Sequence, residues 1–239
     1  MSNNPDDSKL RISRHYIHLI GVIVPILMLW NGVCDFIFAY SPKLNGAQYS
    51  TMMFWDAVRT ANGHPNWMVM LAQTAGWLYP IYAMSYFIWW TGMRRAGFWL
   101  STVPCAILAY ALLMIGGVQH AGFAYLSVLA RAKDLVGSTD PAFYAMAERL
   151  LVEHFFWGDL TAIVALIVGT IWHGVGILSG RTMFPRWFIF LSPLGVLTFE
   201  MVVGNFLPAP FAGILLGMFG TWFMFVPTVA ASVWMWRRV

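Results

Sequence analysis

Six long apolar segments are the feature that most limits what this chain can fold into. About 20 apolar residues in a helix cross the hydrocarbon layer of a bilayer. Only 10% of the 239 residues are charged, against about 25% in soluble domains. The pattern predicts an all-α, polytopic membrane bundle with six transmembrane helices. The expected spans are residues 16–40, 66–91, 98–122, 152–179, 187–206 and 210–236.

The lysines and arginines give the expected orientation of these spans. With both termini cytoplasmic, nine of the 14 basic residues fall on the inner side and five on the outer side. Cytoplasmic loops are enriched in Lys and Arg, so this asymmetry favours six spans and two cytoplasmic ends. The nine are Lys9, Arg11, Arg14, Arg94, Arg95, Arg181, Arg186, Arg237 and Arg238.

The same pattern predicts the domain organisation and the location. Residues 1–15 read as a polar cytoplasmic tail, and residues 16–239 as one transmembrane domain in the cell inner (plasma) membrane. The first apolar segment is too long for a signal-peptide core, so it is expected to remain as a span. The net charge of +4 comes mostly from loops, so it indicates how the chain is oriented in the membrane. With no basic stripe or phosphate-binding glycine motif, no nucleic-acid partner is expected.

Prolines and glycines suggest how the helices bend and pack. Proline inside a helix removes a backbone donor and bends the helix, and five of the expected spans contain one. Bent helices can enclose a cavity. Gly176 and Gly180 have the four-residue spacing that permits close helix approach. In the loop before the fourth span, Asp140 and Pro141 predict the start of a short helix. The five prolines are Pro25, Pro80, Pro104, Pro193 and Pro227.

Carboxylic acids inside, or at the edge of, these spans are the strongest functional signal. A carboxylate at the centre of a membrane helix costs at least ~2.5–3.5 kcal/mol, so such residues indicate function by default. Asp35, Asp159 and Glu200 all fall roughly 8–11 Å below the outer edge of the hydrocarbon. His120, Glu153 and His154 approach the same layer, whereas His173 falls nearer the inner side.

This layer predicts an acid–base site. Carboxyl groups in a low dielectric resist ionisation, and a protonated acid beside an imidazole forms a general acid–base pair. The candidate catalytic residues are Asp35, His120, His154, Asp159 and Glu200. The candidate substrate-binding residues are Asn31, Trp30, Trp77, Glu153 and Asn205.

Other interpretations of these residues stay open. Asp35 and Asn31 could form a satisfied interhelical hydrogen bond, and Glu153 could be the solvated start of the fourth span. His and carboxylate side chains also bind Zn²⁺ or iron, but no His-x-x-x-His spacing is present. No metal ligand is therefore assigned and the cofactor stays unknown, with a metal or haem possible.

Several short motifs resemble an uncharacterised bacterial integral-membrane family, a domain of unknown function. The resemblance implies a compact six-span bundle in which Asp35 and His120 matter, and it implies no reaction. The matching motifs are Gly32-Val-Cys-Asp35, Gly117-Val-Gln-His120-Ala-Gly-Phe123, Phe184-Pro-Arg-Trp187 leading to Leu191-Ser-Pro193, and Leu207-Pro-Ala-Pro210.

Three functions fit the sequence. The first is an intramembrane enzyme, such as an isomerase or cyclase, acting on a small hydrophobic, isoprenoid- or lipid-like ligand. The second is a proton-coupled transporter or a receptor for an amphipathic ligand. The third is a structural subunit in which the polar layer joins helices. The expected partners are the lipid bilayer and a small hydrophobic ligand, with a homo-oligomer left open as an alternative.

Overall fold

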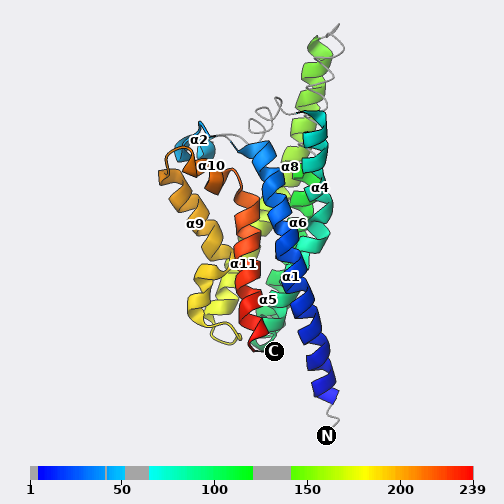
Figure 1. The fold of residues 1–239 in the computed structure, drawn as a ribbon, viewed down its shortest axis with the longest axis vertical. Helices are drawn as coiled ribbons and strands as arrows, with labels where there is room; N and C mark the ends of the chain where they lie inside the picture. The colour runs from blue at the N-terminus through cyan, green and yellow to red at the C-terminus, as the bar shows by residue number, and fades with distance from the viewer. Residues whose placement is uncertain (1–4, 41, 52–64, 121–140, 239) are drawn as a thin grey trace.

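The chain folds into a bundle of helices. The computed structural model describes residues 5–40, 42–51, 65–120 and 141–238, and within these ranges it contains helices and no strand. The all-α fold class is therefore confirmed. The longer helices lie side by side with their long axes roughly along the long axis of the molecule (Figure 1).

The described elements follow one another along the chain, with residues 52–64 and 121–140 between them outside the described ranges. They are α1 (Pro5–Ala39), α2 (Gly46–Thr51), α4 (Asn66–Ala83), α5 (Ser85–Met93), the 3₁₀ turn η2 (Arg94–Ala96), α6 (Phe98–Ile115), the π-helical turn η3 (Gly116–His120), α8 (Pro141–Leu178), the 3₁₀ helix η4 (Arg186–Leu191), α9 (Pro193–Phe206), α10 (Phe211–Leu216) and α11 (Phe219–Trp236).

Within the described residues, three helices are long and apolar enough to cross a membrane. The qualifying stretches are Arg14–Ile37, Phe98–Val118 and Trp157–Leu178. They correspond to the first, third and fourth expected spans. The other three expected spans are interrupted. Residues 66–91 divide into α4 and α5 at Met84, and residues 210–236 divide into α10 and α11.

The fifth expected span differs most from the prediction. Pro193 was expected to bend a helix within residues 187–206, but it is the first residue of α9. The Ser192 hydroxyl accepts a hydrogen bond from the Gly195 amide and so caps the helix. Proline suits the first helical position because its missing amide donor is not needed there. The 14 residues of α9 span only about 21 Å, less than a hydrocarbon layer of about 30 Å.

Two predicted boundaries also move. The short helix expected at Pro141 is the first part of α8, which continues without a break for 38 residues. The expected polar tail is also helical from Pro5 onward, because α1 extends past the apolar segment toward the N-terminus. In Figure 1 this first part of α1 projects beyond the rest of the bundle.

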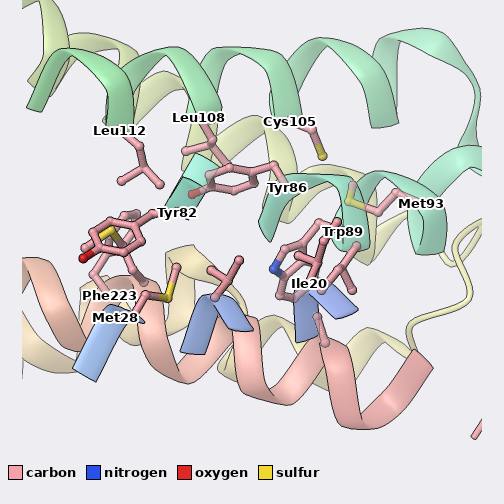
Figure 2. Close-up of a cluster of buried hydrophobic side chains, with 14 of the residues drawn as sticks. Ile20, Met28, Tyr82, Tyr86, Trp89, Met93, Cys105, Leu108, Leu112 and Phe223 are labelled. Carbon is pink, nitrogen blue, oxygen red and sulfur yellow. The ribbon is translucent and has the colours of Figure 1, made fainter. Parts of the chain in front are cut away.

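The hydrophobic core lies among α1, α4, α5, α6 and α11. Tyr82 and Tyr86 lie between α6 on one side and α1 with α11 on the other (Figure 2). Trp89 packs against Phe184 with ring centroids 4.7 Å apart. Tyr82 also donates its hydroxyl to the Leu27 carbonyl at 2.9 Å. Burial of these rings, rather than polar contacts, provides most of the packing between these helices.

One end of the bundle collects most of the arginines, and we call it the basic end. It contains η2, the loop from α8 to η4, and the end of α11. These segments meet through two hydrogen bonds, from the Met183 amide to the Gly92 carbonyl at 2.8 Å and from Trp234 Nε1 to the Met183 carbonyl at 3.0 Å. Its arginines are Arg94, Arg95, Arg181, Arg186, Arg237 and Arg238.

Candidate functional site

A three-residue hydrogen-bonded cluster joins α1 to α11. Asn31 and Asp35 lie one turn apart on α1, and Asn31 Nδ2 donates to Asp35 Oδ2 at 2.8 Å. The Thr221 hydroxyl on α11 donates to the same carboxyl oxygen at 2.8 Å. Asn31 Nδ2 also approaches Thr221 Oγ1 at 3.0 Å. The carboxyl group of Asp35 is thus fixed between two helices rather than free to rotate.

Close backbone approach makes this cluster possible. A Cβ atom on Gly32 would lie 3.1 Å from Thr221 Cγ2, so the small residue lets α11 come near α1. Asn31 is 0% exposed. A buried amide and carboxyl group need partners in a low dielectric. Asn31 on the same helix and Thr221 on α11 donate to the Asp35 carboxyl group, whereas Asn31 Oδ1 has no hydrogen-bond partner among the described residues.

Aromatic residues of α4 and the preceding turn of α1 enclose the cluster. Tyr79 lies against Asn31 and close to Asp35, and it is almost fully buried. Trp30 Nε1 donates to the Thr74 hydroxyl at 2.9 Å and ties α1 to α4. Trp30, a predicted substrate-binding residue, is next to Asn31 in the chain and points toward α4.

Glu200 is the most deeply buried acid of the described residues. It is 0% exposed on α9, and neither carboxyl oxygen has a hydrogen-bond partner within the described chain. The group lies close to the backbone amide of Phe223 without forming a hydrogen bond of good geometry. A carboxyl group in such surroundings favours its neutral, protonated form.

The first turns of α11 separate Glu200 from Asp35. Thr221 contacts Asp35, and Phe223, two residues further along the helix, contacts Glu200. Residues two apart in a helix point in nearly opposite directions. The two acids therefore approach α11 from opposite sides at a similar height, with α11 running between α9 and α1 (Figure 1).

Asp159 lies on a third side of the same layer. It is 7% exposed on α8, beside Gly158, where an added Cβ would lie 2.8 Å from Val118 of η3. An added Cβ on Gly116, at the other end of η3, would clash with the ring of Tyr79. A continuous series of contacts thus leads from the α8 turn that carries Asp159, through η3, to the Asp35 cluster.

Three predicted binding residues have other surroundings than the Asp35 cluster. Trp77 is 73% exposed and faces outward from the bundle. Glu153 lies on the exposed first part of α8, where it accepts a hydrogen bond from Arg149 Nε at 2.7 Å. This bond raises the pKa of Arg149. Asn205 donates to the Met201 carbonyl of its own helix at 2.6 Å, so its amide has a local structural partner.

The predicted histidines separate into two groups. The side chains of His120 and His154 lie outside the described part of the structure. His173 is fully buried on α8, with its ring 4.7 Å from Trp89 in an edge-on contact. Neither ring nitrogen of His173 has a hydrogen-bond partner among the described residues. Its contact with Trp89 places it nearer the basic end than the carboxyl layer, as its sequence depth predicted.

Sequence reasoning missed Thr221 and Tyr79. Both occur in apolar segments, where a hydroxyl is easily read as a local bond to the backbone. One signal was present. Asn31 and Asp35 share one face of the first span, so a polar residue at matching depth in another span was required. Thr221, next to the small residue Gly220, meets this requirement.

This arrangement can hold and transfer protons. It places a carboxyl group with no hydrogen bond in the described chain on one side of α11 and a carboxyl group with two donors on the other side, in an interior of low dielectric. It does not assemble a metal site from the described residues, where no three His, Cys, Asp or Glu side chains come together.

Comparison with known proteins adds no further constraint. No family model, curated protein or solved structure matches the chain.

Proposed function

We propose that this chain is an integral membrane enzyme with an intramembrane acid–base site. It would act on a small hydrophobic substrate, isoprenoid- or lipid-like, as an isomerase or cyclase does. The single observation that carries the proposal is Glu200, a wholly buried acid with no hydrogen-bond partner in the described chain. A carboxyl group in a low dielectric resists ionisation, and Glu200 has no structural hydrogen bond in the described chain that proton transfer would break.

The proposed step needs no second reactant. The Glu200 hydroxyl gives its proton to a substrate double bond, and the resulting carbocation loses a proton from an adjacent carbon. That proton returns to the Glu200 carboxylate, so the double bond moves and the acid is regenerated. Buried aromatic rings can stabilise the transient positive charge through cation–π contacts. Asp35, fixed by Asn31 and Thr221, lies on the other side of α11 and takes no part in this step.

Deuterium labelling tests this step without knowing the substrate. Membranes containing the protein would be incubated with a cell lipid extract in D₂O and examined by untargeted mass spectrometry. We expect a deuterium-labelled lipid with the wild type and its loss in Glu200→Gln, which keeps the size but cannot donate an acidic proton. Glu153→Gln is the matched control and should label normally. Equal labelling in all three proteins would contradict the proposal.

A second function is favoured by the position of Asp35. Its carboxyl group joins α1 to α11, and both helices contain an internal proline, Pro25 and Pro227. Protonation of Asp35 would change which atom donates in the Thr221 contact and could let the two helices move apart. A proton-coupled transporter uses this kind of change. Proton uptake by reconstituted vesicles that is lost in Asp35→Asn, with no lipid labelling, would favour transport over catalysis.

We also propose six crossings with both termini cytoplasmic in the inner membrane. Three helices meet the length and hydropathy expected of a span. The other three crossings would each be made by two consecutive helices: α4 with α5, η4 with α9, and α10 with α11. The gathering of six arginines at the basic end supports this orientation, because cytoplasmic loops are rich in Lys and Arg.

A further inference from the structure

The basic end contains a hollow that the carboxyl layer does not use. It has a volume of about 420 Å³ and lies between the loop from α8 to η4 and the end of α11. Its polar walls carry two guanidinium groups, and its remaining lining is mostly apolar or aromatic. The principal lining residues are Met183, Phe184, Arg186, Trp187, Trp234 and Arg238.

Each guanidinium group lies against a residue of the hollow or its rim. Arg238 lies over the Trp234 ring with its Cζ 4.1 Å from the centroid. Arg186 lies over Gly180, where a Cβ would come within 3.2 Å of Arg186 Nε and where φ is +70°. Glycine is favoured there because it adopts this backbone conformation and leaves room for the guanidinium group.

The two arginines have no acidic partner in the described structure. Neither forms an ion pair with a described side chain, and the ion pair between Arg149 and Glu153 lies at the far end of α8. Among the described side chains, no acid therefore balances the positive charge of the hollow.

The walls of the hollow are fixed before any ligand arrives. The Trp234 indole donates to the Met183 carbonyl, and the Thr182 hydroxyl donates to the Phe184 carbonyl at 2.9 Å. Phe184 is buried and stacks on Phe188 with centroids 4.9 Å apart. A rigid wall lowers the entropy lost when a ligand binds.

The surroundings of the hollow match a lipid–water interface. Trp187 lies at the rim of the hollow and is 52% exposed. It packs edge-on against Trp234, with the ring centroids 5.8 Å apart. Beyond the rim, Phe190 of η4 is also exposed. Tryptophan is enriched at the level of lipid head groups, and an exposed apolar surface beside a basic hollow suits a ligand with an anionic head and a hydrocarbon tail.

We propose that this hollow binds the phosphate group of an anionic phospholipid. Arg186 and Arg238 would share the phosphate oxygens, because the guanidinium fork pairs well with phosphate. The acyl chains would leave along Trp187 and Phe190. Basic pockets between membrane helices on the cytoplasmic side bind anionic head groups in this manner. The site is separate from the carboxyl layer and does not depend on the proposed reaction.

Native mass spectrometry of the delipidated full chain tests the proposal. The probes are phosphatidylglycerol, phosphatidylcholine and inorganic phosphate, each added alone. We expect one phosphatidylglycerol to bind in preference to phosphatidylcholine. The double variant Arg186→Gln/Arg238→Gln should bind it roughly 25-fold more weakly, from a contribution of about fivefold for each arginine.

A matched variant separates a built site from general attraction. Arg94→Gln/Arg95→Gln removes the same charge from the same end but touches neither wall of the hollow, so it should keep wild-type binding. Equal weakening in both double variants would overturn the proposal, since it would show diffuse attraction only. Displacement of the lipid by inorganic phosphate would also overturn it, in favour of a soluble phosphate ester. Thermal melts of both variants check that each has folded.

Discussion

At the scale of single residues, the contacts of Asp35 and Glu200 assign different roles to two buried acids. Asp35 receives hydrogen bonds from Asn31 and Thr221, so its place in the fold depends on partners. Glu200 is buried without a hydrogen-bond partner in the part of the chain that the structure describes. Its burial is a cost that the fold carries, as expected where strain serves function. A substitution that removes a partner of Asp35 should therefore lower the melting temperature, whereas a neutral replacement of Glu200 should not.

Replacement of Thr221 by valine tests the structural role of the Asp35 cluster. The change keeps the shape but leaves the Asp35 carboxyl group short of a donor. Leaving a buried polar group unsatisfied costs about 1–3 kcal/mol, so the melting temperature in detergent should fall by several degrees. Thr198→Val is the control, because Thr198 is exposed and its hydroxyl bonds only the Leu194 carbonyl of its own helix. Equal melting of the two variants would show that the cluster contributes nothing to stability.

Replacement of Glu200 by glutamine should have the opposite effect on stability. The amide keeps the size but cannot ionise, so the fold no longer carries a buried acid. The melting temperature should hold or rise, while the deuterium labelling described above is lost. A marked loss of stability instead would mean that Glu200 joins helices as part of a structural network, and the acid–base role would be withdrawn.

The sequence predicted some site residues and could not predict others, for identifiable reasons. Depth along each span follows from residue counting, so the shared layer of Asp35, Asp159 and Glu200 was accessible. Helix rotation does not follow from counting. The sequence therefore could not show that Trp77 faces outward, nor that α11 lies between Asp35 and Glu200. Thr221 was missed because a hydroxyl in an apolar segment gives no distinct signal.

At the scale of helices, the sequence predicted where a helix lies better than whether that helix runs without a break. Apolar composition predicted where the chain crosses the bundle, but the breaks at Met84 and between α10 and α11 have no comparable compositional mark. Pro193 illustrates the difficulty. It was expected inside a helix, but with Ser192 as the cap it begins one. A proline's effect depends on whether a capping residue precedes it.

Close contact between α6 and α8 gives a prediction at this scale. A Cβ on Gly176 would lie 2.6 Å from the Leu100 carbonyl oxygen and would also meet Met93. Gly176→Ala should therefore push α8 away from α6 and destabilise the protein by about 1–3 kcal/mol. Gly117→Ala makes the same change where nothing lies within 4 Å, and it should be tolerated. The measurement is the melting temperature of both variants, and a stable Gly176→Ala would contradict the predicted contact.

At the scale of the whole molecule, the orientation of the bundle is testable by labelling. Lys43 and Arg181 are exposed and lie beyond opposite ends of the bundle. In a chain with Cys34 and Cys105 replaced by alanine, an impermeant maleimide should label Lys43→Cys in intact cells. It should label Arg181→Cys only after the membrane is permeabilised. Labelling of both from the same side would contradict six crossings.

The central claim is that a carboxylic acid keeps its proton inside this bundle at neutral pH. Infrared spectroscopy of the protein in vesicles measures this directly, because a protonated acid has a carbonyl stretch that a carboxylate lacks. We predict this band at neutral pH in the wild type and in Glu153→Gln, and a reduced band in Glu200→Gln. A wild-type spectrum at neutral pH without a protonated-acid band, or one unchanged in Glu200→Gln, would contradict the account.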